Sequence, residues 1–171
     1  MKWCGISGSW RKANEELKTD VERAVRRIVN SGDGIITGGA LGVDHIATQT
    51  VLRNAAHPEE RLKVYLPVSF ERYIIHLYRR TIENVIKAAE QADDLAFQLI
   101  SIRKKYPRCI FDNWGFEEVN PESYYARNGR IVQDCDELYA FHVNQTKGVQ
   151  DAIDKARGLG KPVHIKEYSI R

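Results

Sequence analysis

The sequence predicts a three-layer α/β domain, in which a mainly parallel sheet of about five strands lies between two layers of helices. Short runs of β-branched and other apolar residues alternate along the chain with longer amphipathic segments. This alternation is typical of parallel strands joined by crossover helices. The segment from Thr37 to Asp44 adds a turn with three glycines directly before a helix, a pattern typical of strand–helix junctions that bind anions.

In the first half of the chain, each expected element follows from apolar spacing and from turn residues. Asn14 is a good N-cap residue, and Leu17, Val21 and Val25 behind it form a helical stripe. Pro67 ends the third strand. The expected elements are a strand over residues 3–6, a helix over 14–30, a strand over 34–37, a helix over 43–51, a strand over 62–66 and a helix over 70–92.

The second half contains a break in this pattern. We expect an irregular excursion over about residues 93–121, with some helix over 95–106 and a compact aromatic segment around Trp114 and Phe116. Regular alternation returns at Pro121 with a helix, a strand over 137–143, a helix capped by Thr146 and a last strand over 163–165. Because no linker or internal repeat is visible, we expect residues 1–171 to form one domain.

Composition limits the function classes. The chain has 26 Lys and Arg against 23 Asp and Glu, so it lacks the large basic field that is typical of strongly basic nucleic-acid-binding proteins. Its three cysteines show no metal-binding spacing, and their odd number favours reduced thiols in the cytoplasm. The histidines show no metal-ligand spacing either, so we expect no metal site. No apolar run approaches the length of a membrane span.

The glycine turn is the first candidate site. Gly38, Gly39 and Gly42 allow positive φ and a close approach of a ligand to the backbone, while the helix start behind them offers N–H donors. Asp44 lies in the first helical turn, where it either stabilises the helix dipole or accepts a hydrogen bond from a ligand. The alternative explanation is that the glycines serve turn geometry alone.

Further candidate residues lie in loops that follow other strands, where ligands of open parallel sheets bind. Arg127 and Arg130 are three residues apart, so they share a helix face and could clamp a phosphate. Thr146 begins a helix and forms a second candidate anion site with the residues after it. The full set of expected ligand-binding residues is Ser7, Gly8, Ser9, Arg11, Gly38, Gly39, Ala40, Gly42, Asp44, Arg127, Asn128, Arg130, Thr146, Lys147 and Gly148.

Several of these segments together resemble the superfamily that contains the DNA-processing protein Smf/DprA and the cytokinin-activating LOG proteins. They are Gly5–Ser9, Thr37–Asp44, Ala126–Val132, and Thr146–Gly148 with Gly160–Val163. The second of these segments is close to the G-G-A-x-G-x-D of DprA-like and molybdenum-cofactor-carrier-like members. The resemblance implies a modified Rossmann fold and a bound nucleotide or molybdopterin-type cofactor.

Two departures restrict what the resemblance implies. LOG proteins have P-G-G-x-G-T-x-x-E at the last helix, whereas this chain has Asn144 to Asp151 there, without a glutamate in register. Relatives that resemble DprA often carry a basic residue where this chain has Leu41. The first departure weakens the implied glycosidic chemistry, and the second weakens the implied contact with DNA.

Three hypotheses for the function follow. The leading one is binding of a nucleotide or nucleotide-like phosphorylated small molecule, without strong catalysis. The second is binding of single-stranded DNA, and the third is hydrolysis or transfer at a nucleoside N-glycosidic bond, for which Asp44 and Asp151 are the candidate catalytic carboxylates. No complete catalytic constellation can be assigned, so the sequence leaves open whether the protein is an enzyme. We also expect a homo-oligomer.

Overall fold

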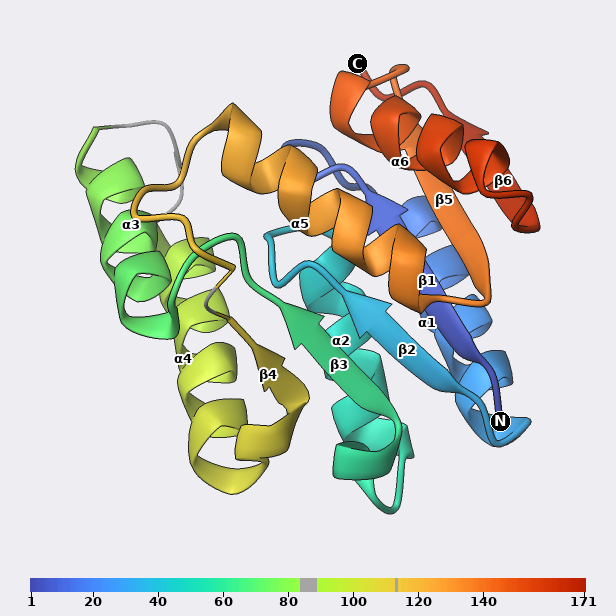
Figure 1. Ribbon diagram of the computed structural model, residues 1–171, viewed down its shortest axis with the longest axis horizontal. Coiled ribbons are helices and arrows are strands. Elements are labelled where there is room, and N and C mark those ends of the chain that lie inside the picture. Colours follow the sequence, from blue (N-terminus) through green and yellow to red (C-terminus); the bar gives the residue numbers. More distant parts are fainter. Residues whose placement is uncertain (84–88, 113) are drawn as a thin grey trace.

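The computed structural model describes residues 1–83, 89–112 and 114–171 (Figure 1). Its described strands form one sheet of six, all parallel, in the order β4-β3-β2-β1-β5-β6. The strands are β1 (Trp3–Gly8), β2 (Gly34–Thr37), β3 (Leu62–Tyr65), β4 (Ile110–Phe111), β5 (Glu137–Val143) and β6 (Val163–Tyr168). The predicted three-layer α/β fold is confirmed, with one strand more than the sequence indicates.

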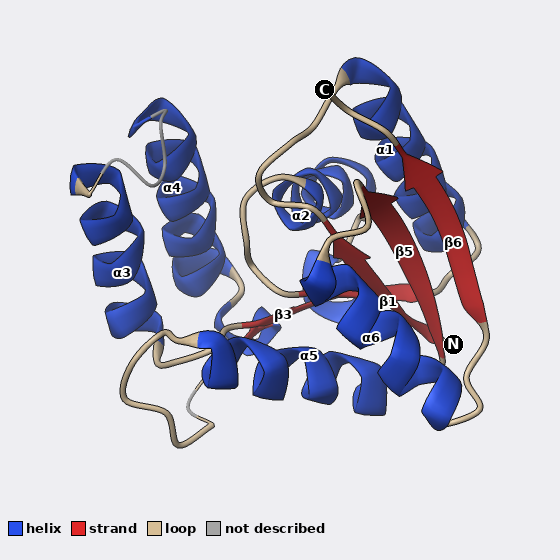
Figure 2. Cartoon of the chain, turned by 90° about the horizontal axis from the view of Figure 1, so that it is seen from above, coloured by secondary structure: helices blue, strands red, loops and turns tan. Residues whose placement is uncertain are grey.

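Helices cover both faces of the sheet. They are α1 (Glu15–Asn30), α2 (Val43–Asn54), α3 (Phe70–Ile82), α4 (Ala89–Lys105), α5 (Pro121–Asp134) and α6 (Lys147–Gly158). Figure 2 shows α1 and α2 on one side of the sheet and α5 and α6 on the other. Helices α3 and α4 pack against each other near the β4 edge, and α4 shares the core of α1 and α2.

Local sequence explains how the flanking helices begin and which face they bury. The side chain of Asn14 accepts a hydrogen bond from the N–H of Leu17 at 2.9 Å, which satisfies one of the donors that every helix start leaves open. Asn120 and Ser123 form a reciprocal capping box at the start of α5. The predicted apolar stripe of α1 is buried against the sheet.

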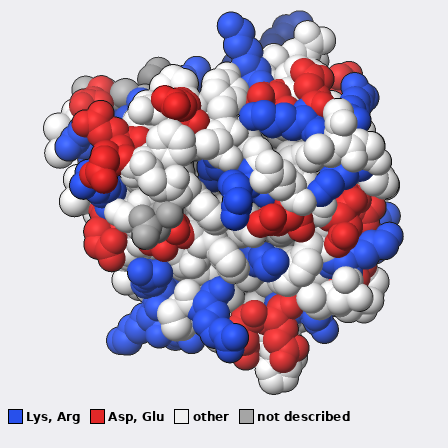
Figure 3. Space-filling model, in the orientation of Figure 1, with Lys and Arg blue, Asp and Glu red and all other residues white. Residues whose placement is uncertain are grey.

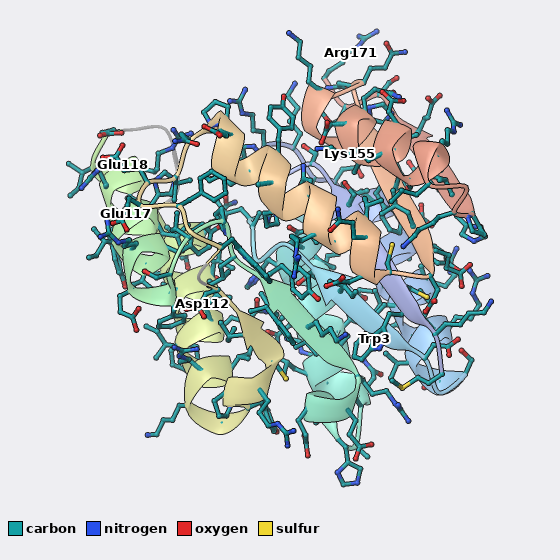
Figure 4. All side chains as sticks on the ribbon, viewed as in Figure 1. Trp3, Asp112, Glu117, Glu118, Lys155 and Arg171 are labelled. Carbon is teal, nitrogen blue, oxygen red and sulfur yellow. The ribbon has the colours of Figure 1, made fainter. Side chains whose placement is uncertain are left out.

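The region from 70 to 121 differs from its prediction. Two helices, α3 and α4, replace the single helix expected over 70–92; part of that helix, residues 84–88, lies outside the described residues. The expected excursion is also more regular than predicted, because α4 and the two-residue strand β4 both belong to the α/β framework. Asp112, labelled in Figure 4, caps α3 by accepting from the N–H of Phe70 at 2.8 Å.

The sheet topology determines where a ligand crevice can form. Helix α1 follows β1 on one face, whereas α5 precedes β5 on the other, so the strand order reverses between β1 and β5. Ligands of open parallel sheets bind beyond the carboxyl ends of the strands at such a point. Within the described ranges, no helix is long and apolar enough to cross a membrane. That residues 1–171 form one domain stays a prediction.

Candidate functional site

The predicted site residues come from three loops and one helix at the carboxyl edge of the sheet. The loops follow β1, β2 and β5, which are neighbours in the sheet, and the helix is α5. The loop after β1 lies between the other two. Its Ser9 carbonyl accepts from the N–H of Val43 at 3.1 Å, and its Lys12 ammonium donates to the carbonyl of Ile170 at 3.3 Å. The predicted residues are therefore brought to one edge by the fold.

Two glycines of the turn after β2 are required by the protein's own packing. A Cβ on Gly38 would collide with the guanidinium of Arg127 and the carboxylate of Asp44. Gly42 has φ +70°, and a Cβ there would collide with the carbonyl of Ser9. At both positions other groups of this chain, rather than a ligand, lie close to the glycine backbone.

Gly39 also has an internal role. Its φ of +64° lies in the left-handed region, and a Cβ there would meet the side chain of Leu66. The hydroxyl of Tyr73, which is buried on α3, donates to the carbonyl of Gly39 at 3.0 Å. The turn is therefore held from α3 as well as from α5.

A buried ion pair lies beneath this turn. The guanidinium of Arg127 is 3.9 Å from the carboxylate of Asp44, and the two side chains are 8% and 9% exposed. Arg127 also donates to the carbonyl of Gly38, and its Nε donates to Asn128 Oδ1 at 3.1 Å. Asp44 accepts from the N–H of Ala40 at 3.3 Å. Five of the predicted site residues thus form one network.

Burial changes the acidity of Asp44. Removal of the carboxylate from water raises the pKa of Asp44 to about 6, although the positive charge of Arg127 and backbone hydrogen bonds from Ala40 and Gly38 oppose that rise. A buried carboxyl group that titrates near neutral pH is a common feature of functional sites, and structural ion pairs show it too.

The loop after β1 is shaped by the start of α2. Gly8 lies against Val43, with no space for a Cβ. Ser9 is buried, and its hydroxyl accepts from the N–H of Arg11 at 3.3 Å, so it stabilises the loop. Ser7 is half-buried, while the side chain of Arg11 is exposed. Of these four predicted residues, Arg11 presents its side chain most freely to solvent.

Trp10 forms an aromatic and basic cluster that the sequence did not indicate. The guanidinium carbon of Arg11 lies 4.7 Å from the ring centre of Trp10, and that of Arg80 on α3 lies 5.9 Å from it. Cations at such distances are attracted to the indole ring. The basic pair Arg79–Arg80 was visible in the sequence, but its meeting with Trp10 depends on the tertiary fold.

Tyr124 and His76 lie beside the buried pair. The guanidinium carbon of Arg127 is 5.5 Å from the ring centre of Tyr124, whose hydroxyl is 3.5 Å from His76 Nε2. Burial, together with the charge of Arg80 and Arg79, lowers the pKa of His76. This shift favours the neutral imidazole, and His76 extends the polar network from α5 to α3.

Arg130 is separated from Arg127. Arg127 is buried under the glycine turn, whereas Arg130 is exposed, with its guanidinium carbon 4.8 Å from the ring centre of Trp114. Arg130 lines an open hollow of about 500 Å³ on the outer side of α5, together with Tyr125 and Lys155. The two arginines do not act together on one phosphate in this arrangement.

The start of α6 differs from the glycine turn because it contains an unused donor. Thr146 is the N-cap residue, yet its side chain makes no capping hydrogen bond. Its Oγ1 atom is buried and has no hydrogen-bond partner among the described residues. Lys147 and Gly148 are exposed beside it. The carbonyl of Thr146 lies 3.2 Å from His142 Nε2.

The loop that leads into α6 has an unusual backbone. Asn144 and Gln145 have φ values of 48° and 52°, in the left-handed region that side-chain-bearing residues rarely adopt. Asn144 is fixed by two hydrogen bonds to the backbone of Ile170, at 2.7 Å and 2.9 Å. Strained backbone of this kind is often found at binding sites.

Asp151 lies on the side of α6 that faces α5, and it has a partner. Its carboxylate is 2.7 Å from the ammonium of Lys155, which also donates to the carbonyl of Tyr125 at 3.1 Å. Figure 4 shows Lys155 between α6 and α5. Within residues 1–83, 89–112 and 114–171, no group of three or more His, Cys, Asp or Glu residues could hold a metal ion.

Comparisons with known proteins establish the fold. No protein-family model matches the sequence, and no curated protein matches it. The structure is similar to DNA processing protein A (DprA) of Helicobacter pylori, which binds single-stranded DNA, with a TM-score of 0.67 and 19% identity over 96% of this chain and 64% of that chain. DprA of Streptococcus pneumoniae gives a TM-score of 0.66 and 16% identity over 96% of this chain and 50% of that chain.

A third similar structure is the molybdenum cofactor binding protein of Rippkaea orientalis, with a TM-score of 0.60 and 18% identity over 98% of this chain and 77% of that chain. This chain spans 64% and 50% of the two DprA chains. The resemblance seen in the sequence is thus confirmed for the fold: the chain has a DprA-like fold, which the molybdenum cofactor binding proteins share.

Proposed function

We propose that the carboxyl edge of the sheet beyond β1 and β5 binds a nucleotide or a nucleotide-like phosphorylated ligand, with a phosphate at the start of α6. The observation that carries this proposal is the buried Thr146 Oγ1, which has no partner among the described residues. Buried hydroxyls are nearly always hydrogen-bonded. A phosphate oxygen is a strong acceptor for this hydroxyl, and a helix N-terminus favours the negative charge of the phosphate.

The residues beside Thr146 support the same ligand. The exposed Lys147 supplies a positive charge in the first turn of α6, where the helix dipole adds to it. A Cβ on Gly148 would have no atom within 4 Å, so space is available above the backbone there. An anion could therefore approach the helix start without displacing a side chain.

Trp10 supports a ligand that carries a planar ring system. The loop after β1 contacts the start of α2 at Ser9 and the C-terminal segment at Lys12, so it lies at the same edge of the sheet as the proposed phosphate site. Trp10 on this loop is half-buried and offers an aromatic surface for stacking. A nucleotide and a molybdopterin-type cofactor each combine a ring system with a phosphate. Both remain in the ligand class that we propose.

We propose binding without strong catalysis. Asp44 is bonded to Ala40 and paired with Arg127 beneath the turn, and Asp151 is paired with Lys155. Both carboxylates are thus engaged by cations of this chain, whereas N-glycosidic chemistry would require a carboxylate that faces the anomeric carbon of a bound nucleoside. The free, buried cysteines are consistent with reduced thiols, which supports the predicted cytoplasmic location.

A thermal-shift comparison tests the proposal. Each common nucleoside monophosphate is compared with its nucleoside and with inorganic phosphate. At a ligand concentration of about 100 Kd we expect about 2.7 kcal/mol of stabilisation, which corresponds to a rise in Tm of roughly 5–10 °C. The monophosphate should stabilise the protein and its nucleoside should not. Equal shifts from both, or no shift from any phosphorylated compound, would contradict a phosphate site.

Single-stranded DNA is the second candidate, and the cluster of Trp10, Arg11 and Arg80 favours it. Aromatic side chains flanked by arginines stack bases and contact phosphates. The charge balance is less favourable, because Figure 3 shows Lys and Arg interspersed with Asp and Glu on the displayed face. Fluorescence anisotropy with a labelled oligothymidine distinguishes the two: tight binding that falls steeply with salt supports DNA, whereas binding of monophosphates alone supports a small ligand.

A further inference from the structure

Exposed apolar side chains are concentrated on α3 and α4. Of the nine large hydrophobic side chains exposed among the described residues, five lie on these two helices. They are Ile75, Tyr78 and Ile82 on α3 and Phe97 and Ile100 on α4. The helices pack against each other near the β4 edge of the sheet (Figure 2). Large exposed apolar side chains gathered on two neighbouring helices are a feature of interaction sites.

Phe97 lies at the middle of the outer face of α4. The inner face of this helix buries Leu95 and Leu99, while Phe97 is 75% exposed. Glu90 lies two helical turns before Phe97 and Lys104 lies two turns after it, so all three share the outer face. Both charged residues are exposed, and neither forms an ion pair with a described residue.

This face is complementary to a second copy of itself. If two α4 helices pack antiparallel about a two-fold axis at Phe97, Glu90 of one copy meets Lys104 of the other. Because the axis repeats every contact, this ion pair forms twice. In this arrangement the first turn of α4 in one copy, which contains Glu90, lies opposite the basic last turn of α4 in the other copy.

The charges alone do not require a partner. An acidic first turn and a basic last turn also suit the helix's own dipole. The dipole gives no reason, however, for the exposure of Phe97 and Ile100 between the charged ends. Phe97 is a large exposed aromatic side chain at the middle of this face, with Asp93 and Asp94 one turn before it and Lys104 two turns after it. Aromatic side chains of this kind are enriched in protein–protein interfaces.

We infer that the chain forms a two-fold homodimer through the outer face of α4, with the phenyl rings of Phe97 meeting at the axis. A stable interface buries about 800 Å² on each partner, which is more than a single helix face supplies. The exposed apolar side chains Ile75, Tyr78 and Ile82 share one face of the neighbouring α3 and enlarge the surface. The inference is independent of the proposed ligand.

Sedimentation velocity of the unmodified chain and of charge-reversed variants tests this interface at low salt. Glu90→Lys and Lys104→Glu each place like charges opposite one another twice, so each should weaken dimerisation about tenfold in Kd. The double variant restores the pairing with opposite polarity and should dimerise within about threefold of the unmodified chain. Loss of the dimer in the double variant would overturn the inference.

Phe97→Asp tests the centre of the interface. We expect this variant to be monomeric, because it places two carboxylates at the two-fold axis. Leu159→Asp is the matched control, since Leu159 is also an exposed apolar residue but lies at the end of α6; it should leave the dimer unchanged. A monomeric unmodified chain at about 200 μM, or a dimer that persists in Phe97→Asp, would refute the interface.

Discussion

The glycine turn after β2 and the start of α6 after β5 are both helix starts at the carboxyl edge of the sheet, but the structure uses them differently. In the glycine turn, the N–H of Val43 donates to Ser9 and the space above Gly38 contains Arg127. At the start of α6, the hydroxyl of Thr146 has no partner among the described residues. The turn is closed by the chain itself, whereas the start of α6 retains a donor that the described residues do not use.

This difference shows what a glycine-rich motif indicates. Glycine allows a close approach to the backbone, but the approaching group can belong to the protein. At Gly38 that group is a buried guanidinium, which the glycine admits and which pairs with Asp44. The motif most visible in the sequence therefore packs against the protein itself, whereas Thr146 has a hydroxyl without a partner among the described residues.

Removal of Arg127 should have the largest effect on stability. Arg127→Met leaves the Asp44 carboxylate buried without its partner, at a cost of about 3–5 kcal/mol in the free energy of unfolding at pH 7. Urea denaturation measures this loss. Arg130→Met is the matched control, because Arg130 is exposed, and it should change the stability by less than about 0.5 kcal/mol. Similar losses in both variants would contradict the separate roles of the two arginines.

The ionisation of Asp44 should make stability depend on pH. Its pKa is about 6 in the folded protein, above its ordinary value of 3.8. The folded state therefore binds the proton of Asp44 more tightly, so the contribution of Asp44 to stability is fully present below pH 4 and is lost as the pH rises to about 6. The expected loss is about 3 kcal/mol relative to Asp44→Asn, measured by urea denaturation between pH 4 and pH 7. Parallel pH profiles of the two proteins would show that Asp44 is not responsible.

Two glycine substitutions should have opposite effects at the two helix starts. Gly42→Ala forces a side chain into a left-handed conformation and against the Ser9 carbonyl, at a cost of about 2 kcal/mol. Gly148→Ala meets no atom within 4 Å and lies inside α6, so it should stabilise by about 0.5–1 kcal/mol. Thermal unfolding of both variants makes the comparison. Destabilisation by Gly148→Ala would contradict the open space at the start of α6.

Much of the fold could be predicted from the sequence, because most strands and helices bury long apolar stripes. Strand β4 could not, since Ile110 and Phe111 are too few to show a periodicity. The apolar spacing also continued from 70 to 92, so it concealed the division into α3 and α4. A pattern of apolar residues records which face is buried and does not record where the chain reverses.

The candidate site could be predicted in its location but not in its detail. The spacing of Arg127 and Arg130 placed both on one helix face, but only the fold shows that Arg127 enters the space above Gly38. Trp10 and Arg80 are distant in sequence, and they meet because α3 lies near the loop after β1. Such pairs cannot be read from one sequence.

A titration of Thr146→Val with the best-binding nucleoside monophosphate tests the central claim most directly. Because the hydroxyl has no partner in the described structure, the variant should unfold with an unchanged or slightly higher free energy and should bind at least about tenfold more weakly. Thr48→Val is the matched control: it breaks the 3.0 Å hydrogen bond to Thr37, so it should lose about 1 kcal/mol of stability and keep its affinity. Unchanged affinity in Thr146→Val would contradict a phosphate site at the start of α6.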